Sequence, residues 1–218
     1  MELWTGIHSL ETSRVSNVYL VLGPPATLID TGPPGTVWRL LAEMQRAGVQ
    51  PRDLRRLVLT HCDADHIANA RTLQRITGAE VCAHADDIPY ITVAQPLPGP
   101  PARRVIGATI GRLVRPPRVD RALHDGDVLD GLTVLHLPGH TPGHIGLQAG
   151  RVLFAGDTVS GGRRLRPAPR LLTWNEDLAR RSLARMATLD VDLLLPGHGT
   201  PVDDGARRCA DLVAPRVR

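Results

Sequence analysis

Histidine and aspartate are concentrated in one short stretch, LTHCDADHIANA, at residues 59–70. It contains His61, Asp63, Asp65 and His66. Imidazole and carboxylate groups are ligands that Zn²⁺, iron and manganese accept, and a catalytic metal needs about three protein ligands with one position left for water. Alternate residues of an extended segment point the same way, so His61, Asp63 and Asp65 should face together, with His66 following as a helix starts. The stretch therefore predicts ligands for two neighbouring metal ions.

A purely structural interpretation of this stretch is also available. Asp65 would cap a helix that begins at His66 or Ile67, and the histidines would be solvated residues of the turn. Capping accounts for one aspartate and leaves the other three residues unexplained. We therefore favour the metal site.

Further candidate ligands stand where short apolar runs end. The runs are ATLIDTG, RRLVLTH, LTVLHLPGH, RVLFAGD and VDLLLPGHG, and they end in Asp30, His61, His140, Asp157 and His198. Such runs are typical of buried strands. Their carboxyl ends would gather these side chains along one rim of a sheet, in the loops where function usually resides.

Segments with helical periodicity separate these strands. Apolar residues form one stripe in residues 35–48, 67–77 and 176–189. Strands alternating with amphipathic helices predict an α/β or α+β layered domain. One strand-rich half ends near residue 84 and another starts near 127, which suggests two sheets face to face.

A Pro-rich connection at about 86–120 joins these halves. Within it, residues 103–115 predict a basic amphipathic helix that would pack on the core, form a lid over the site or lie on a membrane. Most such helices pack on their own domain, and the sequence leaves the choice open.

Composition excludes several classes of protein. The chain has 218 residues, and no linker divides it, so we expect one domain over 1–218. The net charge is +4, all 26 basic residues are arginine, and aromatic residues make up only 3%, too few for a single-strand nucleic-acid groove. No apolar run approaches the roughly 18 to 20 residues needed to cross a bilayer. We expect no nucleic-acid or membrane partner.

Two further expectations concern the cell compartment. The N-terminus, MELWTGIHSL, lacks the features of an export signal, so we expect a cytoplasmic protein. The three cysteines, Cys62, Cys82 and Cys209, lack a Cys-x-x-Cys spacing and are interpreted as free thiols in a reducing compartment. The sequence gives no indication of the oligomeric state.

The motifs LIDTG, THCDADH, PGHTPGH, FAGDT and LLPGHG, in this order over about residues 15–200, resemble those of the metallo-β-lactamase-fold superfamily. The resemblance implies an α+β fold, the αββα sandwich of two mixed β-sheets with helices on the outer faces. The site would lie along the shared sheet edge.

The same resemblance implies a ligand set. The first metal would be bound by His61, Asp63 and His140, and the second by Asp65, His66 and His198, with Asp157 bridging the two. Asp30 and His144 would support these ligands without binding metal. The implied cofactors are two divalent ions, with zinc favoured.

The activity implied is that of a metal-dependent hydrolase. A metal-bound, bridging hydroxide would attack a small ester, thioester or lactone, and Asp65 would be the catalytic carboxylate that accepts or returns a proton. Glyoxalase II enzymes carry a C-terminal helical domain, whereas about 20 residues follow His198 here, which disfavours that assignment. Lactonases of this fold often carry a tyrosine at the position of Ser160.

Asp63 departs from the family pattern, which has histidine at this position. A carboxylate makes the first metal position harder and better suited to iron or manganese. Three alternatives remain open. In the first, Asp63 does not bind metal and the site holds only one ion. In the second, a single iron held by His61, His140 and Asp157 serves a persulfide dioxygenase-like oxidoreductase, and in the third the chain is a non-catalytic member of the fold.

One basic cluster follows the Asp157 motif. Arg163, Arg164 and Arg166 would face an anionic substrate or form a solvated loop.

Overall fold

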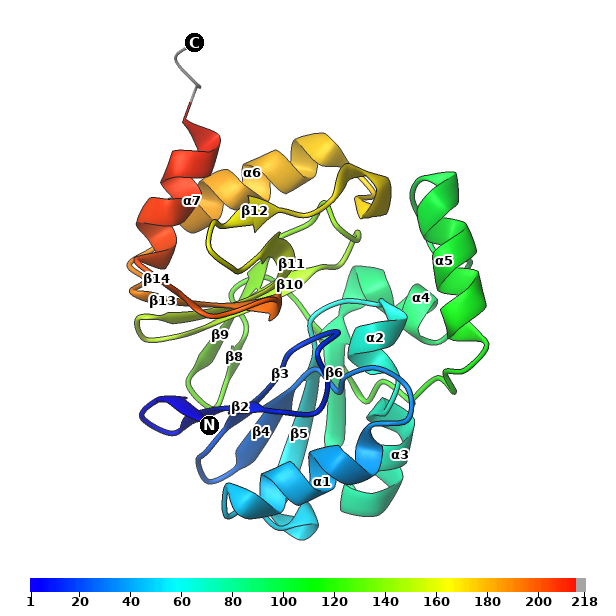
Figure 1. Ribbon diagram of the computed structural model, residues 1–218. Coiled ribbons are helices and arrows are strands. Elements are labelled where there is room, and N and C mark those ends of the chain that lie inside the picture. Colours follow the sequence, from blue (N-terminus) through cyan, green and yellow to red (C-terminus); the bar gives the residue numbers. More distant parts are fainter. Residues whose placement is uncertain (215–218) are drawn as a thin grey trace. The chain divides into compact units, whose positions relative to one another are not determined.

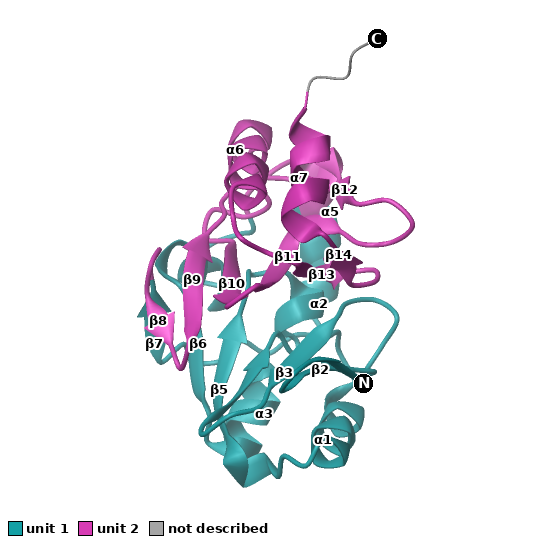
Figure 2. Cartoon of the chain, turned by 90° about the vertical axis from the view of Figure 1, so that its left-hand side faces the viewer, with its two compact units in different colours: residues 1–97, 104–123 teal, residues 98–103, 124–218 magenta. Residues whose placement is uncertain are grey.

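The computed structural model describes residues 1–214 (Figure 1). The chain forms two compact units, coloured separately in Figure 2. Unit 1 comprises Met1–Leu97 and Arg104–Leu123, and unit 2 comprises Pro98–Arg103 and His124–Arg218. The predicted halves correspond to these units, and the single domain over 1–218 stays a prediction.

The elements of unit 1 follow one another along the chain as strands first and then strands alternating with helices. They are β1 (Glu2–Trp4), β2 (Ile7–Leu10), β3 (Val18–Val21), β4 (Ala26–Ile29), α1 (Val37–Arg46), the 3₁₀ helix η1 (Pro51–Asp53), β5 (Leu54–Leu59), α2 (Ala64–Ile67), α3 (Ala70–Thr77), β6 (Glu80–His84), η2 (Ala85–Asp87), α4 (Ile88–Ile91), α5 (Pro101–Gly111), whose residues up to Arg103 belong to unit 2, and β7 (Arg121–Leu123).

The sheet of unit 1 is mixed, with the order β1-β2-β3-β4-β5-β6-β7. The strands β1 to β4 pair antiparallel, and β4 to β7 pair parallel. Helix α1 packs against β2, and α3 packs against β5 and β6 (Figure 1). Parallel strands that are buried on both faces have continuous apolar runs. This explains why the runs ATLI of β4 and LVL of β5 predicted strands.

The elements of unit 2 are strands with helices inserted late in the sequence. They are β8 (Val128–Leu129), β9 (Leu132–His136), β10 (Ile145–Ala149), β11 (Val152–Ser160), β12 (Arg166–Pro167), η3 (Arg170–Leu172), α6 (Glu176–Ala187), β13 (Leu193–His198), β14 (Val202–Asp203) and α7 (Gly205–Val213).

The sheet of unit 2 is also mixed, with the order β14-β13-β11-β10-β9-β8 and β12 paired with β11. Strands β11 and β13 pair parallel, so their carboxyl ends lie together. Helix α6 packs against β11 and α7, and α7 packs against β13. The expected α+β class with two mixed sheets and accompanying helices is confirmed.

Each unit has its own apolar core. In unit 1, Leu28, Leu57 and Met44 are fully buried, and in unit 2 Leu194 and Leu153 are at most 1% exposed. Truncating a leucine at such a position to alanine costs about 2–5 kcal/mol of unfolding free energy. These cores hold the strand ends from which the candidate ligands project.

The helix predicted over 103–115 is α5, and the packing of its apolar face differs from the expectation. Val105 is 65% exposed and Leu113 is 72% exposed, while Arg103, placed off the apolar face by the periodicity, is 2% exposed. Of the three interpretations left open, core packing does not apply to Val105 and Leu113, whereas Val114 of the same predicted stripe packs against the core of unit 1. The described residues contain no helix that combines the length and the apolarity needed to cross a bilayer.

Candidate metal centre

The stretch at residues 59–70 forms a turn at the carboxyl end of β5. The strand ends at Leu59, and helix α2 begins at Ala64 with Asp63 as its N-cap residue. The backbone N–H of His66 donates to the Asp63 carbonyl at 2.9 Å. The alternative interpretation, in which Asp65 caps a helix beginning at His66 or Ile67, does not hold, because the cap position falls on Asp63, whose side chain makes no capping hydrogen bond.

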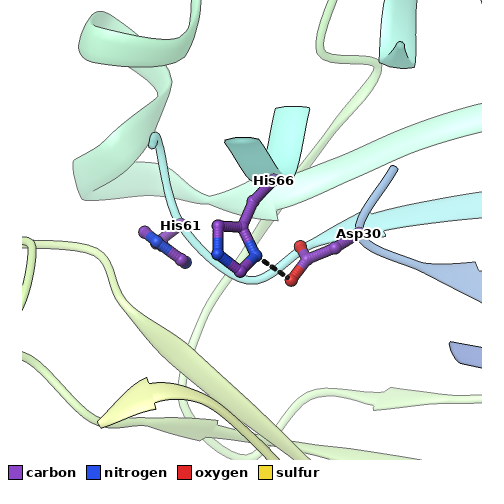
Figure 3. Close-up of side chains that lie close together, drawn as sticks. All are labelled: Asp30, His61 and His66. Atoms are coloured by element: carbon purple, nitrogen blue, oxygen red, sulfur yellow. Dashed lines mark hydrogen bonds and ion pairs between the residues drawn. The ribbon is translucent and has the colours of Figure 1, made fainter. Parts of the chain in front are cut away.

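Asp30, at the end of β4, holds this turn from the neighbouring strand. Its Oδ1 accepts from the backbone N–H of Thr60 at 2.8 Å, and its Oδ2 accepts from the Thr60 hydroxyl at 2.8 Å. Nδ1 of His66 lies 2.8 Å from the same Oδ2, and a dashed line in Figure 3 marks this contact between His66 and Asp30. Because the carboxylate only accepts, Nδ1 of His66 carries the proton, and Nε2 keeps its lone pair for another partner.

Thr60 orients the ring of His61 in the same way, through a hydrogen bond to its Nδ1. Its hydroxyl has one proton, which it donates to Asp30, so its oxygen accepts from Nδ1 of His61 at 2.9 Å. In both histidines, therefore, Nδ1 makes the supporting hydrogen bond and Nε2 is the nitrogen that can act as a metal ligand. The two rings lie close together, with centroids 4.2 Å apart.

Each of these Nε2 atoms lies near a carboxylate oxygen. His61 Nε2 is 3.6 Å from Asp63 Oδ2, and His66 Nε2 is 3.7 Å from Asp65 Oδ2. Two ligands bound about 2.0–2.2 Å from one tetrahedral ion lie about 3.3–3.6 Å apart. Both pairs thus have nearly the spacing of two ligands on a common ion, and the donor set fits a divalent metal.

Two more hydrogen bonds fix the backbone of the turn. The Ser16 hydroxyl donates to the Asp65 carbonyl at 2.6 Å, and the Thr31 hydroxyl donates to the His66 carbonyl at 2.8 Å. Ser16, Thr31 and Thr60 were not among the residues predicted from the sequence. Only Thr60 carries a signal in the sequence, since it directly precedes His61.

Unit 2 brings together three more of the predicted ligands. His198 ends β13, Asp157 lies in β11, and His140 lies in the loop after β9. Oδ2 of Asp157 is 3.0 Å from Nε2 of His198 and 3.7 Å from Nε2 of His140. One carboxylate oxygen therefore faces both imidazole nitrogens.

His144 supports Asp157 through the backbone. It is fully buried, and its Nε2 accepts the backbone N–H of Asp157 at 2.9 Å. Its Nδ1 lies 3.4 Å from the Thr158 hydroxyl. His144 thus holds the strand that carries Asp157, while its own Nε2 is occupied by that contact.

Arg103 is a residue of this region that the sequence did not indicate. A nitrogen of its guanidinium lies 3.3 Å from Nε2 of His140, and the same nitrogen donates to the Leu172 carbonyl. A buried cation is costly unless its donors are satisfied. Arg103 therefore places a fixed positive charge beside a candidate ligand.

Two further histidines make hydrogen bonds with backbone groups, and the cysteines are buried. Nε2 of His136 lies 2.9 Å from the Pro142 carbonyl, and Nδ1 of His84 accepts the backbone N–H of Asp86 at 3.2 Å. Burial raises the pKa of the thiols of Cys82 and Cys209 to about 12, so both are protonated and unreactive at neutral pH.

Comparison with known proteins agrees with this geometry. The chain matches the Metallo-beta-lactamase superfamily over residues 12–198, and it therefore belongs to that superfamily. It is similar to the probable metallo-hydrolase YflN of Bacillus subtilis, with 30% identity in an alignment of 225 positions. The alignment covers 90% of this chain and 85% of YflN.

Two other proteins are informative about chemistry. Hydroxyacylglutathione hydrolase GloC of Haemophilus influenzae is 30% identical over 189 residues, which cover 80% of each chain. The crystal structure of TTHA1623 in a di-iron-bound form is similar with a TM-score of 0.71 and 29% identity, over 88% of this chain and 91% of that one. Metallo-hydrolase homologues and the His and Asp clusters together support a metal-dependent hydrolase.

Proposed function

We propose that this chain is a dinuclear metal-dependent hydrolase of a small ester, thioester or lactone. The proposed ligands are His61, Asp63, Asp65, His66, His140, Asp157 and His198. The observation that carries the proposal is the pair of His Nε2 and Asp Oδ2 separations in the turn after β5, close to the spacing of ligands on a common ion.

In this proposal some residues of the chain bind or orient the metal ligands, and one residue transfers protons. When bound, the ions supply Lewis acidity and lower the pKa of water toward 7, so that a nucleophile exists at neutral pH. Asp30 and Thr60 hold the two histidines in the tautomer that presents Nε2. Asp65, with a side chain 23% exposed, is the carboxylate that accepts a proton from the attacking water and returns it to the leaving group.

Two comparisons bear on the choice of substrate and of metal. The similarity to GloC extends over 80% of that enzyme, so the short segment after His198 no longer argues against a glyoxalase-type thioester substrate. The similarity to a di-iron protein supports iron as an alternative to zinc, in keeping with the added negative charge of Asp63.

The proposal is tested by metal content and turnover on the same preparation. Metal per chain is measured by mass spectrometry on protein purified without an affinity tag or added metal, and hydrolysis is assayed on panels of esters, thioesters and lactones. We expect close to two ions per chain and turnover that is lost with a chelator. Absence of metal after reconstitution would overturn the proposal, and a single iron with oxygen uptake on glutathione persulfide would replace it with the dioxygenase alternative.

A further inference from the structure

The three arginines after the Asp157 motif lie on a structured hairpin. Strands β11 and β12 pair with Ser160 opposite Arg166 and Val159 opposite Pro167. Leu165, between the arginines, is 6% exposed and belongs to the core of unit 2. The hairpin is thus anchored by its strand pairing and by one buried leucine, so the arginines project from a defined backbone.

This hairpin begins beside a candidate metal ligand. Ser160 lies opposite Arg166 on one side and opposite His198 on the other, across β12, β11 and β13. Directly opposite residues of paired strands project from the same face of a sheet. Arg166 and Ser160 therefore share one face of the sheet, and the pairing of Ser160 with His198 brings this part of the hairpin next to the candidate ligand.

The backbone of the hairpin is also held against the turn that follows His198. The N–H of Gly161 donates to the His198 carbonyl at 2.9 Å. A Cβ atom at Gly161 would lie 1.8 Å from the Thr200 carbonyl oxygen, so only glycine permits this approach. This contact holds the start of the hairpin beside the end of β13, which carries His198.

The three arginines differ in charge environment from two others of the same unit. Arg170 and Arg180 each lie within ion-pair distance of Glu176. Arg163, Arg164 and Arg166 have no carboxylate partner among residues 1–214. They line an open hollow of about 760 Å³, whose walls are Ser160, Gly161, Gly162, Arg163, Arg164 and Arg166.

We propose that this hollow binds an anionic group of the substrate, a carboxylate or a phosphate, so that the preferred substrate is an acidic ester, thioester or lactone. The inference rests on the proposed function, because it places the anionic group beside the hydrolytic site. Guanidinium groups bind both anions through paired hydrogen bonds, and the Ser160 hydroxyl supplies another donor. Three uncompensated positive charges around one hollow attract such a group before any specific contact forms.

The first test measures binding without turnover. Inorganic phosphate is titrated calorimetrically into the metal-loaded chain and into the chelator-treated chain. The variant R163A/R164A/R166A should weaken binding by about tenfold or more in both forms, since each lost charged hydrogen bond contributes substantially. The matched control R39A/R55A/R75A removes the same charge from exposed positions of unit 1 and should change binding less than about twofold.

Two outcomes of this titration would overturn the inference. One is equal phosphate binding by the chelator-treated hairpin variant and the chelator-treated unmodified chain. The other is absence of millimolar phosphate binding by the unmodified chain.

The second test compares two esters that differ in charge. For para-nitrophenyl hemisuccinate we expect KM to rise about tenfold in the hairpin variant, with kcat little changed, while kinetics on neutral para-nitrophenyl butyrate stay as in the unmodified chain. Equal losses on both esters would contradict anion recognition. If the unmodified chain hydrolyses no ester, thioester or lactone, the proposed function fails, and the phosphate titration still decides whether the hollow binds anions.

Discussion

The two units assemble their candidate ligands in different ways. In unit 1 the ligands come from one six-residue turn, residues 61–66, and each histidine has its own hydrogen-bonded support from Thr60 or Asp30. In unit 2 they come from three separate segments, namely strand β11, the end of β13 and the loop after β9, and one carboxylate, that of Asp157, faces both histidines. A contiguous turn with separate supports should tolerate the loss of one ligand better than a set that shares one carboxylate.

Removing the shared carboxylate should give the largest effect. In Asp157→Ala we expect metal and activity to be lost together, with kcat/KM reduced on the order of 10³-fold, because the metal contributes several kcal/mol to transition-state stabilisation. Metal content and hydrolysis are measured on the same sample, with the exposed strand residue of the same unit, Asp203→Ala, as the control. Full metal occupancy with normal turnover in Asp157→Ala would remove Asp157 from the site.

Removing the support in unit 1 should weaken the metal without abolishing it. In Asp30→Asn an amide donor would face the Thr60 hydroxyl or Nδ1 of His66, so the tautomers of His61 and His66 would no longer be fixed. Changes of this kind reduce metal affinity about 10- to 100-fold. Competition with a chelating dye measures the affinity, and an unchanged value would show that the turn holds its histidines without Asp30.

Replacing one ligand of the turn should change which metal binds more than whether it binds. In Asp63→His the site loses a negative charge, and we expect the ratio of zinc to iron in protein from cells grown with both metals to rise a few-fold. Mass spectrometry of both metals on each protein gives the ratio. A loss of both metals would indicate that Asp63 has a structural role in the turn.

The smallest effects concern a carboxylate near the end of each sheet, away from the ligands. In unit 1, burial acts to raise the pKa of Asp120, but hydrogen bonds from the Val81 N–H, Arg118 and Gln74 outweigh it and lower this pKa. The folded-state pKa is below the unfolded value of about 3.9, so the stabilisation is present above about pH 4 and is lost as the pH falls through the folded-state pKa. Asp120→Asn should lower the free energy of unfolding by about 1 kcal/mol at pH 7.

Asp125 provides the matching carboxylate of unit 2. Burial again acts to raise its pKa, and hydrogen bonds from Arg185 and the His136 N–H lower it. The Asp125 side chain is 47% exposed, whereas that of Asp120 is 18% exposed, so solvent screening should make Asp125→Asn the milder change. Urea unfolding at several pH values checks both, and a difference from the unmodified chain that does not shrink as the pH falls below about 4 would contradict the assignment.

Much of the strand pattern could be predicted because continuous apolar runs mark buried strands. The helices over 35–48 and 176–189 were predicted to within a few residues of α1 and α6, and the Asn175 side chain, which accepts from the N–H groups of Asp177 and Leu178, explains where α6 begins. Short strands without a clear run, such as β7, β10 and β12, were not predicted, since neighbouring strands rather than local preference define them.

Tertiary contacts account for the other differences from the sequence interpretation. The stripe at 67–77 predicted one helix, whereas α2 ends at Ile67 and α3 begins at Ala70. Between them the Asn69 amide donates to the Thr31 carbonyl at 2.6 Å and the Pro33 carbonyl at 3.0 Å. Periodicity carries no information on such contacts, and the same holds for the burial of Arg103 beside His140.

Asp30 also has a left-handed backbone conformation, with φ of 59°. An L-residue with a β-carbon is strained there, and aspartate tolerates the region better than most. The position thus carries two opposing demands, because glycine would relieve the backbone but has no carboxylate to hold Thr60 and His66. A search for stabilising substitutions that weighed backbone strain alone would therefore select Asp30→Gly, yet that change would leave the buried Thr60 N–H without its acceptor and His66 without its support, so the strain at Asp30 is retained for the turn that carries the ligands.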